Sequence, residues 1–189
     1  MALTDVALCS RALVRLGATP ISSFTQGTAE SDVASHLYAP VRDALLSAYP
    51  WTFAMAQAPL TKSNIPPVAD YASSFILPLD YLRAVSAGNG GRGRGLHYRI
   101  TQGRLHTQAD AVTLTYIFRP SELDFPPYFD MALMARLAAE FCIPLTENTA
   151  RADSLYRLAE GELARARQID SQQDSPGRIE NFTLIDIRQ

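Results

Sequence analysis

Lysine, cysteine and long apolar runs are scarce in this 189-residue sequence. The two cysteines, Cys9 and Cys142, lie far apart in helical apolar patterns and lack the spacing of metal or redox motifs. We therefore expect both to be buried free thiols. No window approaches the roughly 18 apolar residues of a membrane-spanning helix, and no basic leader precedes an apolar run at the N-terminus. These absences predict a protein without a membrane partner that is made and kept in the cytoplasm.

A large charge excess is also lacking. The chain has 17 Lys and Arg against 19 Asp and Glu, a formal net charge of −2. Free-standing nucleic-acid or membrane-surface binders usually carry a clear basic excess, so any basic action must be local. Lys62 is the single lysine. The arginines that supply the remaining positive charge favour bidentate pairing with carboxylates or phosphates.

Catalytic and metal-binding signatures are missing from the sequence. The three histidines, His36, His97 and His106, lack a spacing that would converge on a metal ion. No Gly-x-Ser-x-Gly motif occurs, and no base stands beside any serine. We expect a protein that is not an enzyme and that binds no cofactor or metal.

Apolar residues at helical spacing predict two helices before residue 50. The first runs from about Thr4, a capping residue, to Leu16, and Gly17 ends it. The second covers residues 30 to 49. Pro40 interrupts that pattern, so we expect either a kink near His36 or two shorter helices.

Two more helices are predicted in the second half of the chain. Pro126 and Pro127 open one that should be the most buried, with a break at Pro144. Residues 148 to 170 return to an amphipathic pattern. The apolar residues expected to cover the first of these two helices are Met131, Leu133, Met134, Leu137, Phe141 and Ile143.

Between these helices the apolar period changes from 3.6 to 2. Residues 57 to 74 carry three prolines and predict an extended surface connection. Alternation over 96–101 and 112–118, with a turn at Gln102 and Gly103, predicts antiparallel strands, and residues 75–86 add to them. We expect three or four strands in one small sheet, with Pro78 at its edge or start.

The predicted fold is therefore α+β and mainly α. An antiparallel helix bundle, residues 3–56 and 127–170, carries a β insertion over about 74–120. Together they form a single domain over residues 1–170, and residues 171–189 form a flexible link and a C-terminal arm. The arm has an apolar spacing near that of a strand, at Phe182, Leu184 or Ile185, and Ile187. It suits strand addition to, or groove binding on, another subunit, although a disordered or self-docked terminus is the alternative.

The glycine-rich stretch GNGGRGRG, residues 88–95, is the most conspicuous loop. A phosphate-binding P-loop needs a lysine and a following helix, and a dinucleotide fingerprint needs a strand and a helix around its glycines. Neither pattern is present. Nucleic-acid binding through Arg92 and Arg94 remains open, although such segments are usually repeated. The other interpretation is a mobile tip between two strands of the inserted sheet.

Several segments, in unbroken order over roughly residues 3–170, resemble the head-to-tail connector family of tailed phages, also called tail tubular protein A, adaptor or gatekeeper. The segment VRDALLSAYPWTFA, residues 41–54, carries the most specific part of the likeness. No single motif is diagnostic, because the family lacks catalytic signatures. The other segments are ALCSRALVRLGATPISSF (7–24), LPLDYLRA (77–84), YRITQGRLHTQADAVTLTYIFR (98–119) and FDMALMARLAAEF (129–141).

The resemblance implies a structural virion protein at the head–tail junction. Such proteins form a ring, commonly of twelve copies, that docks beneath the portal protein and offers a surface to the tail nozzle or tail-tube protein. DNA would meet the ring only as it passes through the channel. Trp51 and Phe53 would anchor the two leading helices to the bundle, and the C-terminal arm would reach the portal or a neighbouring copy. Arg92 and Arg94 would pair with acidic residues of a partner, or line the DNA path.

Overall fold

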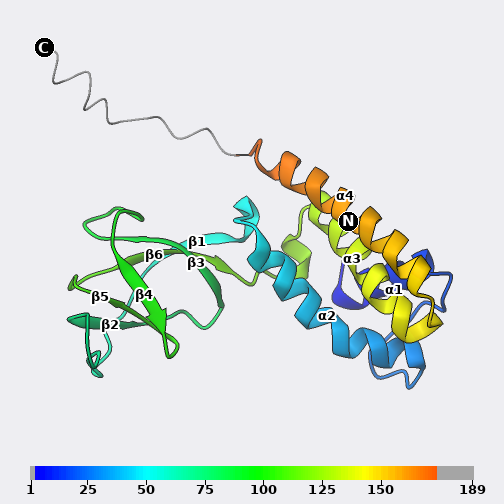
Figure 1. The fold of residues 1–189 in the computed structure, drawn as a ribbon, viewed down its shortest axis with the longest axis horizontal. Helices are drawn as coiled ribbons and strands as arrows, with labels where there is room; N and C mark the ends of the chain where they lie inside the picture. The colour runs from blue at the N-terminus through cyan, green and yellow to red at the C-terminus, as the bar shows by residue number, and fades with distance from the viewer. Residues whose placement is uncertain (1–2, 174–189) are drawn as a thin grey trace, which may run out of the picture.

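The computed structural model describes residues 3–173 and shows an elongated molecule with helices at one end and strands at the other (Figure 1). The fold is α+β and mainly α, as the sequence predicts. The described part contains four α-helices and two three-stranded antiparallel sheets. All six strands lie between the second and third helices in the sequence, so the β part is an insertion into the helix bundle. The arm residues Phe182, Leu184, Ile185 and Ile187 lie outside the described residues.

The first two helices begin at threonine caps. Helix α1 (Asp5–Arg15) starts where the Thr4 side chain accepts a hydrogen bond from the Ala7 N–H, and it ends before Gly17, whose φ is 67°. Helix α2 (Ala29–Ala48) begins with a capping box formed by Thr28 and Ser31. These caps satisfy N–H groups that have no partner within the helix.

Two interior prolines do not end their helices. Helix α2 is continuous through Pro40, so the expected division into two shorter helices is wrong. Helix α3 (Pro127–Thr146) also continues past Pro144 and ends only at Glu147, which has a φ of 53°. Both prolines are exposed. Water can therefore satisfy the carbonyl that each proline leaves without a partner, which makes the interruption tolerable.

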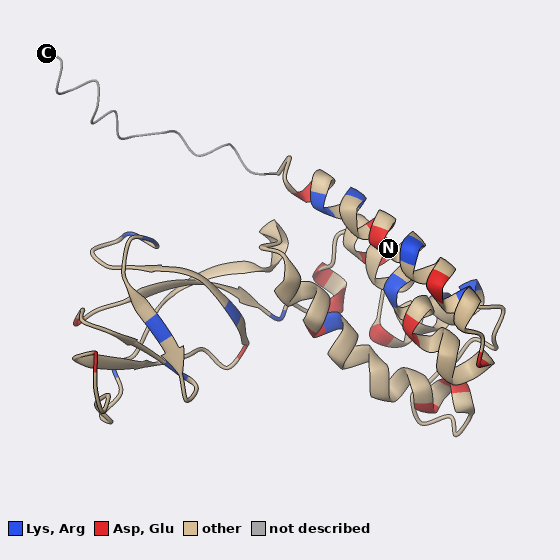
Figure 2. Cartoon of the chain, in the orientation of Figure 1, with Lys and Arg blue, Asp and Glu red and all other residues tan. Residues whose placement is uncertain are grey.

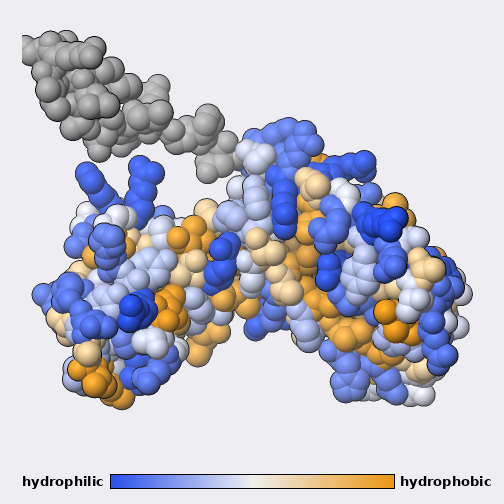
Figure 3. Space-filling model, viewed as in Figure 1, coloured by the Kyte–Doolittle hydropathy of each residue, from blue (hydrophilic) through white to orange (hydrophobic). Residues whose placement is uncertain are grey.

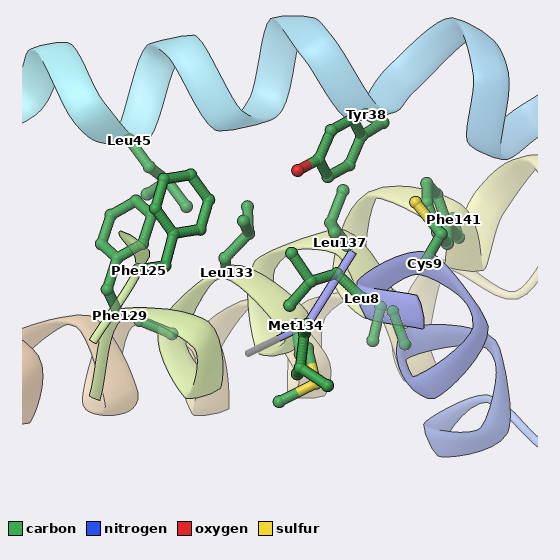
Figure 4. Packing of buried hydrophobic residues seen from close by; sticks show 14 of the residues in the cluster. Leu8, Cys9, Tyr38, Leu45, Phe125, Phe129, Leu133, Met134, Leu137 and Phe141 are labelled. Carbon is green, nitrogen blue, oxygen red and sulfur yellow. The ribbon is translucent and has the colours of Figure 1, made fainter. Parts of the chain in front are cut away.

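The helical core is built around α3. Eleven of its 20 residues are buried, more than in any other described helix. Figure 4 shows Leu133, Leu137 and Phe141 pointing from α3 toward α1 and α2. Cys9 and Cys142 are both buried and free, as expected. Met131 and Ile143 differ from the expectation, because they face solvent at 42% and 47% exposure.

Helix α4 (Thr149–Asp170) packs along α3 through a row of small and apolar residues. Ala152, Ala159, Leu163 and Ala166 are all buried on its inner side. Its outer side carries Glu160 and Arg157, which are exposed. The amphipathic pattern predicted for residues 148–170 is thus present.

The β part consists of two sheets rather than one. Strands β1 (Met55–Pro59), β6 (Thr113–Phe118) and β3 (Tyr81–Gly88) form the first sheet, in that order. Strands β2 (Ser73–Ile76), β5 (Arg104–Thr107) and β4 (Tyr98–Thr101) form the second. The β part therefore begins at residue 55, not at about 74. Pro78 lies between β2 and β3, and the predicted turn at Gln102 and Gly103 joins β4 to β5.

A second, smaller core lies within the β part and explains why six strands form. Phe75, Leu105 and Leu114 are its largest fully buried members, and they come from both sheets. Ala56 and Ala58 of β1 pack against this cluster. Ile117 of β6 belongs instead to the helical core, so this strand contacts both parts of the molecule.

Candidate interaction surface

An aromatic cluster sits where the helical part leads into the β part. Trp51 is fully buried, and its indole N–H donates to the Leu45 carbonyl at 3.0 Å. Its ring meets Phe129 of α3 edge-on at 5.2 Å between ring centroids. Phe53, half-buried, packs on Phe129 and on Phe125 at 5.0 and 6.0 Å. Edge-to-face pairs of this kind add to the stabilisation from burial, so the direction in which β1 leaves the bundle is well determined.

Asp170 holds the end of α4 against the same junction. Its carboxylate accepts hydrogen bonds from the Thr52 N–H and hydroxyl, and from the Tyr128 hydroxyl at 2.8 Å. Asp170 is 1% exposed, and the hydrogen bonds compensate for that burial. The chain beyond α4 therefore starts at a fixed position, immediately beside the start of β1.

Four charged residues connect the other side of the junction. Arg119, which follows β6, makes two hydrogen bonds to Asp43 of α2, at 3.1 and 2.6 Å. Arg42 binds Asp43 at 2.9 Å and Glu122 at 2.7 Å. Partial burial would raise the pKa of Asp43, yet the hydrogen bonds from Arg119 and Arg42 outweigh it and lower that pKa. The network stabilises the orientation of the β part on the helices.

The glycine-rich loop, residues 88–95, is not the tip of a hairpin within one sheet. It joins β3 to β4, which belong to different sheets, so the predicted arrangement was wrong. The Gly93 carbonyl accepts hydrogen bonds from Ser86 Oγ at 2.7 Å and from Thr115 Oγ1 at 3.1 Å. The loop therefore folds back onto the β1-β6-β3 sheet.

The chain approaches other atoms closely at two glycines of this loop: backbone atoms of Arg92 at Gly88, and the side chains of Gln57 and Thr115 at Gly93. A Cβ on Gly88 would lie 2.1 Å from the Arg92 carbonyl oxygen. A Cβ on Gly93 would lie 2.5 Å from Gln57 Nε2 of β1 and 2.6 Å from Thr115 Oγ1. The glycines thus serve close packing of the loop on the sheet rather than phosphate binding.

Arg92 and Arg94 are exposed at the outer side of this loop. Neither forms an ion pair with any residue in the range 3–173. Figure 2 shows basic positions in blue on the loop between β3 and β4, and Figure 3 shows hydrophilic side chains projecting from that end of the molecule. Two guanidinium groups held on an ordered loop are available for an external acidic group.

The glycine-rich loop and Gln173, the last described residue, both lie beside β1. Gln57 touches Gly93 on one side and donates to Thr115 Oγ1 at 3.1 Å. Gln57 also lines an open hollow of about 320 Å³ together with Gln173, the last described residue. The beginning of the C-terminal segment and the arginine loop therefore border the same strand. We call this region, formed by β1, Gln173 and residues 88–95, the β1 surface.

Charge is divided unequally between the two ends of the molecule. Residues 55–118 carry six Lys or Arg against three Asp, a formal charge of +3. The described helical residues, 3–54 and 119–173, carry nine Arg against 13 Asp or Glu, a formal charge of −4. The small net charge of the chain thus conceals a basic β part and an acidic helical part, as the colours of Figure 2 indicate.

Two sequence comparisons with known proteins found no match. No family model matches the chain, and no curated protein matches its sequence. Within residues 3–173, no group of three or more His, Cys, Asp or Glu side chains is placed to hold a metal ion. No helix in the described part is both long and apolar enough to cross a membrane.

Sequence reasoning missed the polar residues that hold the junction together. Asp43 and Arg119 are 76 positions apart, and Thr52 and Asp170 are 118 apart. Such pairs leave no local signal. The segment VRDALLSAYPWTFA, however, contains Arg42, Asp43 and Trp51, so the most specific part of the family resemblance coincides with this junction.

Proposed function

We propose that this protein is a structural adaptor of a tailed phage or phage-like particle, located in the virion at the head–tail junction. Several copies form a ring beneath the portal protein and present a surface to the tail. The separation of charge between the two ends of each subunit is the structural observation that best supports this function. The resemblance of residues 3–170 to the connector family supplies the partners: a portal protein, a tail nozzle or tail-tube protein, and further copies of the chain.

Opposite charge at the two ends of one subunit favours head-to-tail contact between copies. A basic β part can lie against the acidic helical part of the next copy, which is a heterologous contact. Heterologous contacts repeated by a constant rotation generate a closed ring when that rotation divides a full turn evenly and adds no rise along the axis. Arg92 and Arg94, exposed and without ion-pair partners in residues 3–173, are the groups best placed to bind carboxylates of a neighbour.

An open groove on the helical part offers apolar surface for such a contact. The groove, about 470 Å³, runs between α2 and α4 and includes the apolar side chains of Leu37, Val41 and Ala44. Charged residues border it, among them Arg136 and Glu160, which form an ion pair of 3.2 Å. An apolar centre with a polar rim is typical of protein interfaces.

The rigid junction suits a subunit that must keep two partners at a fixed separation. Trp51 anchors the start of the inserted β part to the helices, and Asp170 holds the end of α4 at the same place. The portal and the tail would bind different ends of the molecule. A subunit that bent freely between these ends would not keep the two partners at a fixed distance and orientation.

Reversal of the loop charges tests this function. The double variant Arg92→Glu/Arg94→Glu should lose ring formation in electron microscopy of the protein mixed with its portal. Arg157→Glu, which makes the same kind of charge change on the exposed side of α4, serves as the matched control and should retain rings. Rings that form equally well in the double variant would contradict a role for the loop in subunit contact.

The same variants distinguish nucleic-acid binding through the loop, which is the competing function. In that case the unmodified chain alone would shift DNA in a gel, with strong salt dependence, and the double variant would not. The adaptor function predicts no such shift at physiological salt. The basic β part would then act on protein carboxylates and not on phosphates.

A further inference from the structure

Strand β1 leaves one edge of its sheet without a partner among the described residues. It pairs only with β6, and just beyond the strand the Leu60 N–H donates to the Val112 carbonyl at 2.9 Å. Hydrogen-bonded pairs alternate along antiparallel strands, so the backbone groups of Ala58 and Ala56 form hydrogen bonds with β6, as Leu60 does with Val112. Gln57 then directs its backbone N–H and carbonyl toward the open edge. Pro59 faces that edge too, where its missing N–H disrupts no pairing.

The edges of β2 and β3 are better protected. The edge of β2 is covered by residues 61–63, through hydrogen bonds from the Ile76 N–H to the Thr61 carbonyl and from the Ser63 N–H to the Ser74 carbonyl. The edge strand β3 is interrupted by two register shifts. Proteins commonly protect edge strands by a covering segment or by bulges of this kind. Among residues 3–173, the five-residue edge of β1 has neither a covering segment nor a bulge.

The C-terminal segment begins at this same edge. Gln173 lines the hollow beside Met55 and Gln57, and the hydrogen bonds of Asp170 fix its position. Residues 181–187, NFTLIDI, are rich in β-branched and aromatic residues, which favour strands. Seven residues, 174–180, lie between Gln173 and Asn181, and the eight steps from Gln173 to Asn181 span up to about 26 Å, more than the roughly 17 Å length of a five-residue strand. Pro176-Gly177 supplies a turn sequence within that link.

We propose that residues 181–187 bind the open edge of β1 in the same chain as an added strand, giving the sheet order 181–187, β1, β6, β3. Docking within one chain is favoured because a short tether gives an effective concentration on the order of millimolar. Main-chain hydrogen bonds to Gln57 would provide the affinity. This inference concerns the free chain and does not depend on the ring. It implies that the C-terminal segment is held on β1 and must leave that edge to reach a partner.

Amide hydrogen exchange of Gln57 tests the added strand. In the full chain, exchange at Gln57 should be slowed at least about tenfold relative to the variant Ile185→Pro, which removes a donor from the added strand. The Ala56 and Ala58 amides, already bonded to β6, should exchange equally in both proteins. Ser175→Pro places the same residue in the link and should leave the protection of Gln57 unchanged.

Three results would overturn the proposal. The first is equal exchange at Gln57 in the wild-type chain and in Ile185→Pro. The second is protection at β4 in place of Gln57. The third is recovery of protection when isotope-labelled Ile185→Pro is mixed with unlabelled wild-type chain, because the segment would then dock between molecules. Unchanged exchange at the Ala56 and Ala58 amides would show that Ile185→Pro keeps the β1–β6 pairing, so that faster exchange at Gln57 reports the loss of docking.

Discussion

Removal of the Trp51 side chain should destabilise the protein more than any surface substitution. Trp51 is 0% exposed, packs edge-on against Tyr49 and Phe129, and donates to the Leu45 carbonyl. Replacement of a buried Trp by Ala costs about 3–5 kcal/mol, because packing is lost and a cavity remains. For a chain of this length, about 2–4 °C of melting temperature is lost per kcal/mol, so Trp51→Ala should melt roughly 6–20 °C lower.

Urea unfolding followed by far-ultraviolet circular dichroism measures this effect. Trp51→Phe keeps an aromatic ring but loses the N–H donor, so it should cost only about 1–2 kcal/mol. Leu79→Ala is the control, because Leu79 is fully exposed and its truncation should change the free energy of unfolding by less than about 0.5 kcal/mol. A loss below about 1 kcal/mol for Trp51→Ala would refute the anchoring role.

Three further substitutions test separate parts of the account. Burial raises the pKa of Asp130 to about 6, so the folded protein still holds a proton that the unfolded chain releases near pH 4. The free energy of unfolding should therefore fall as the pH rises from about 4 to about 6. Asp130→Asn should therefore stabilise the protein by on the order of 2 kcal/mol at pH 7, and it should not stabilise it at pH 3.5. Chemical unfolding at the two pH values measures this difference, and the exposed Asp124→Asn is the control that should not show it. Gly88→Ala should lower the free energy of unfolding by about 1–3 kcal/mol, because its Cβ would collide with the Arg92 carbonyl; an unchanged urea midpoint would exclude that close approach. Gly161 lies in α4, and an added Cβ there would have no atom of another segment within 4 Å. Gly161→Ala should therefore raise the free energy of unfolding by about 0.5–1 kcal/mol and the melting temperature with it. A lower melting temperature would show that other atoms occupy the space beside Gly161.

Local signals in the sequence predicted most of the helical architecture. Thr4 and Gly17 mark the two ends of α1 because capping depends on neighbouring residues only. The division into two helices expected at Pro40 and the break expected at Pro144 were wrong, because the cost of a proline depends on whether its helix face is exposed, which a sequence does not display.

The β part was harder to predict because its first strand lacks a strong pattern. Ala56 and Ala58 are the inward-facing residues of β1, and alanine gives little alternation signal. Pro59 at its end resembles the start of a loop. Without β1, the predicted strands fit a single sheet. The sequence therefore did not predict the division into two sheets.

The candidate surface was predicted in its parts but not as a unit. Arg92, Arg94 and the C-terminal segment stood out in the sequence by composition. The loop and Gln173, the last described residue, border the same strand because Gly93 approaches Gln57 closely and because Asp170 holds the end of α4 beside Thr52. These are long-range contacts, which a linear pattern does not encode.

Electron microscopy of the purified chain mixed with the portal protein of the same particle tests the proposed function most directly. The account predicts a closed ring of copies seated on the portal, with the basic β part of each subunit against the acidic helices of the next. Absence of a complex, or bound copies that fail to close into a ring, would contradict it.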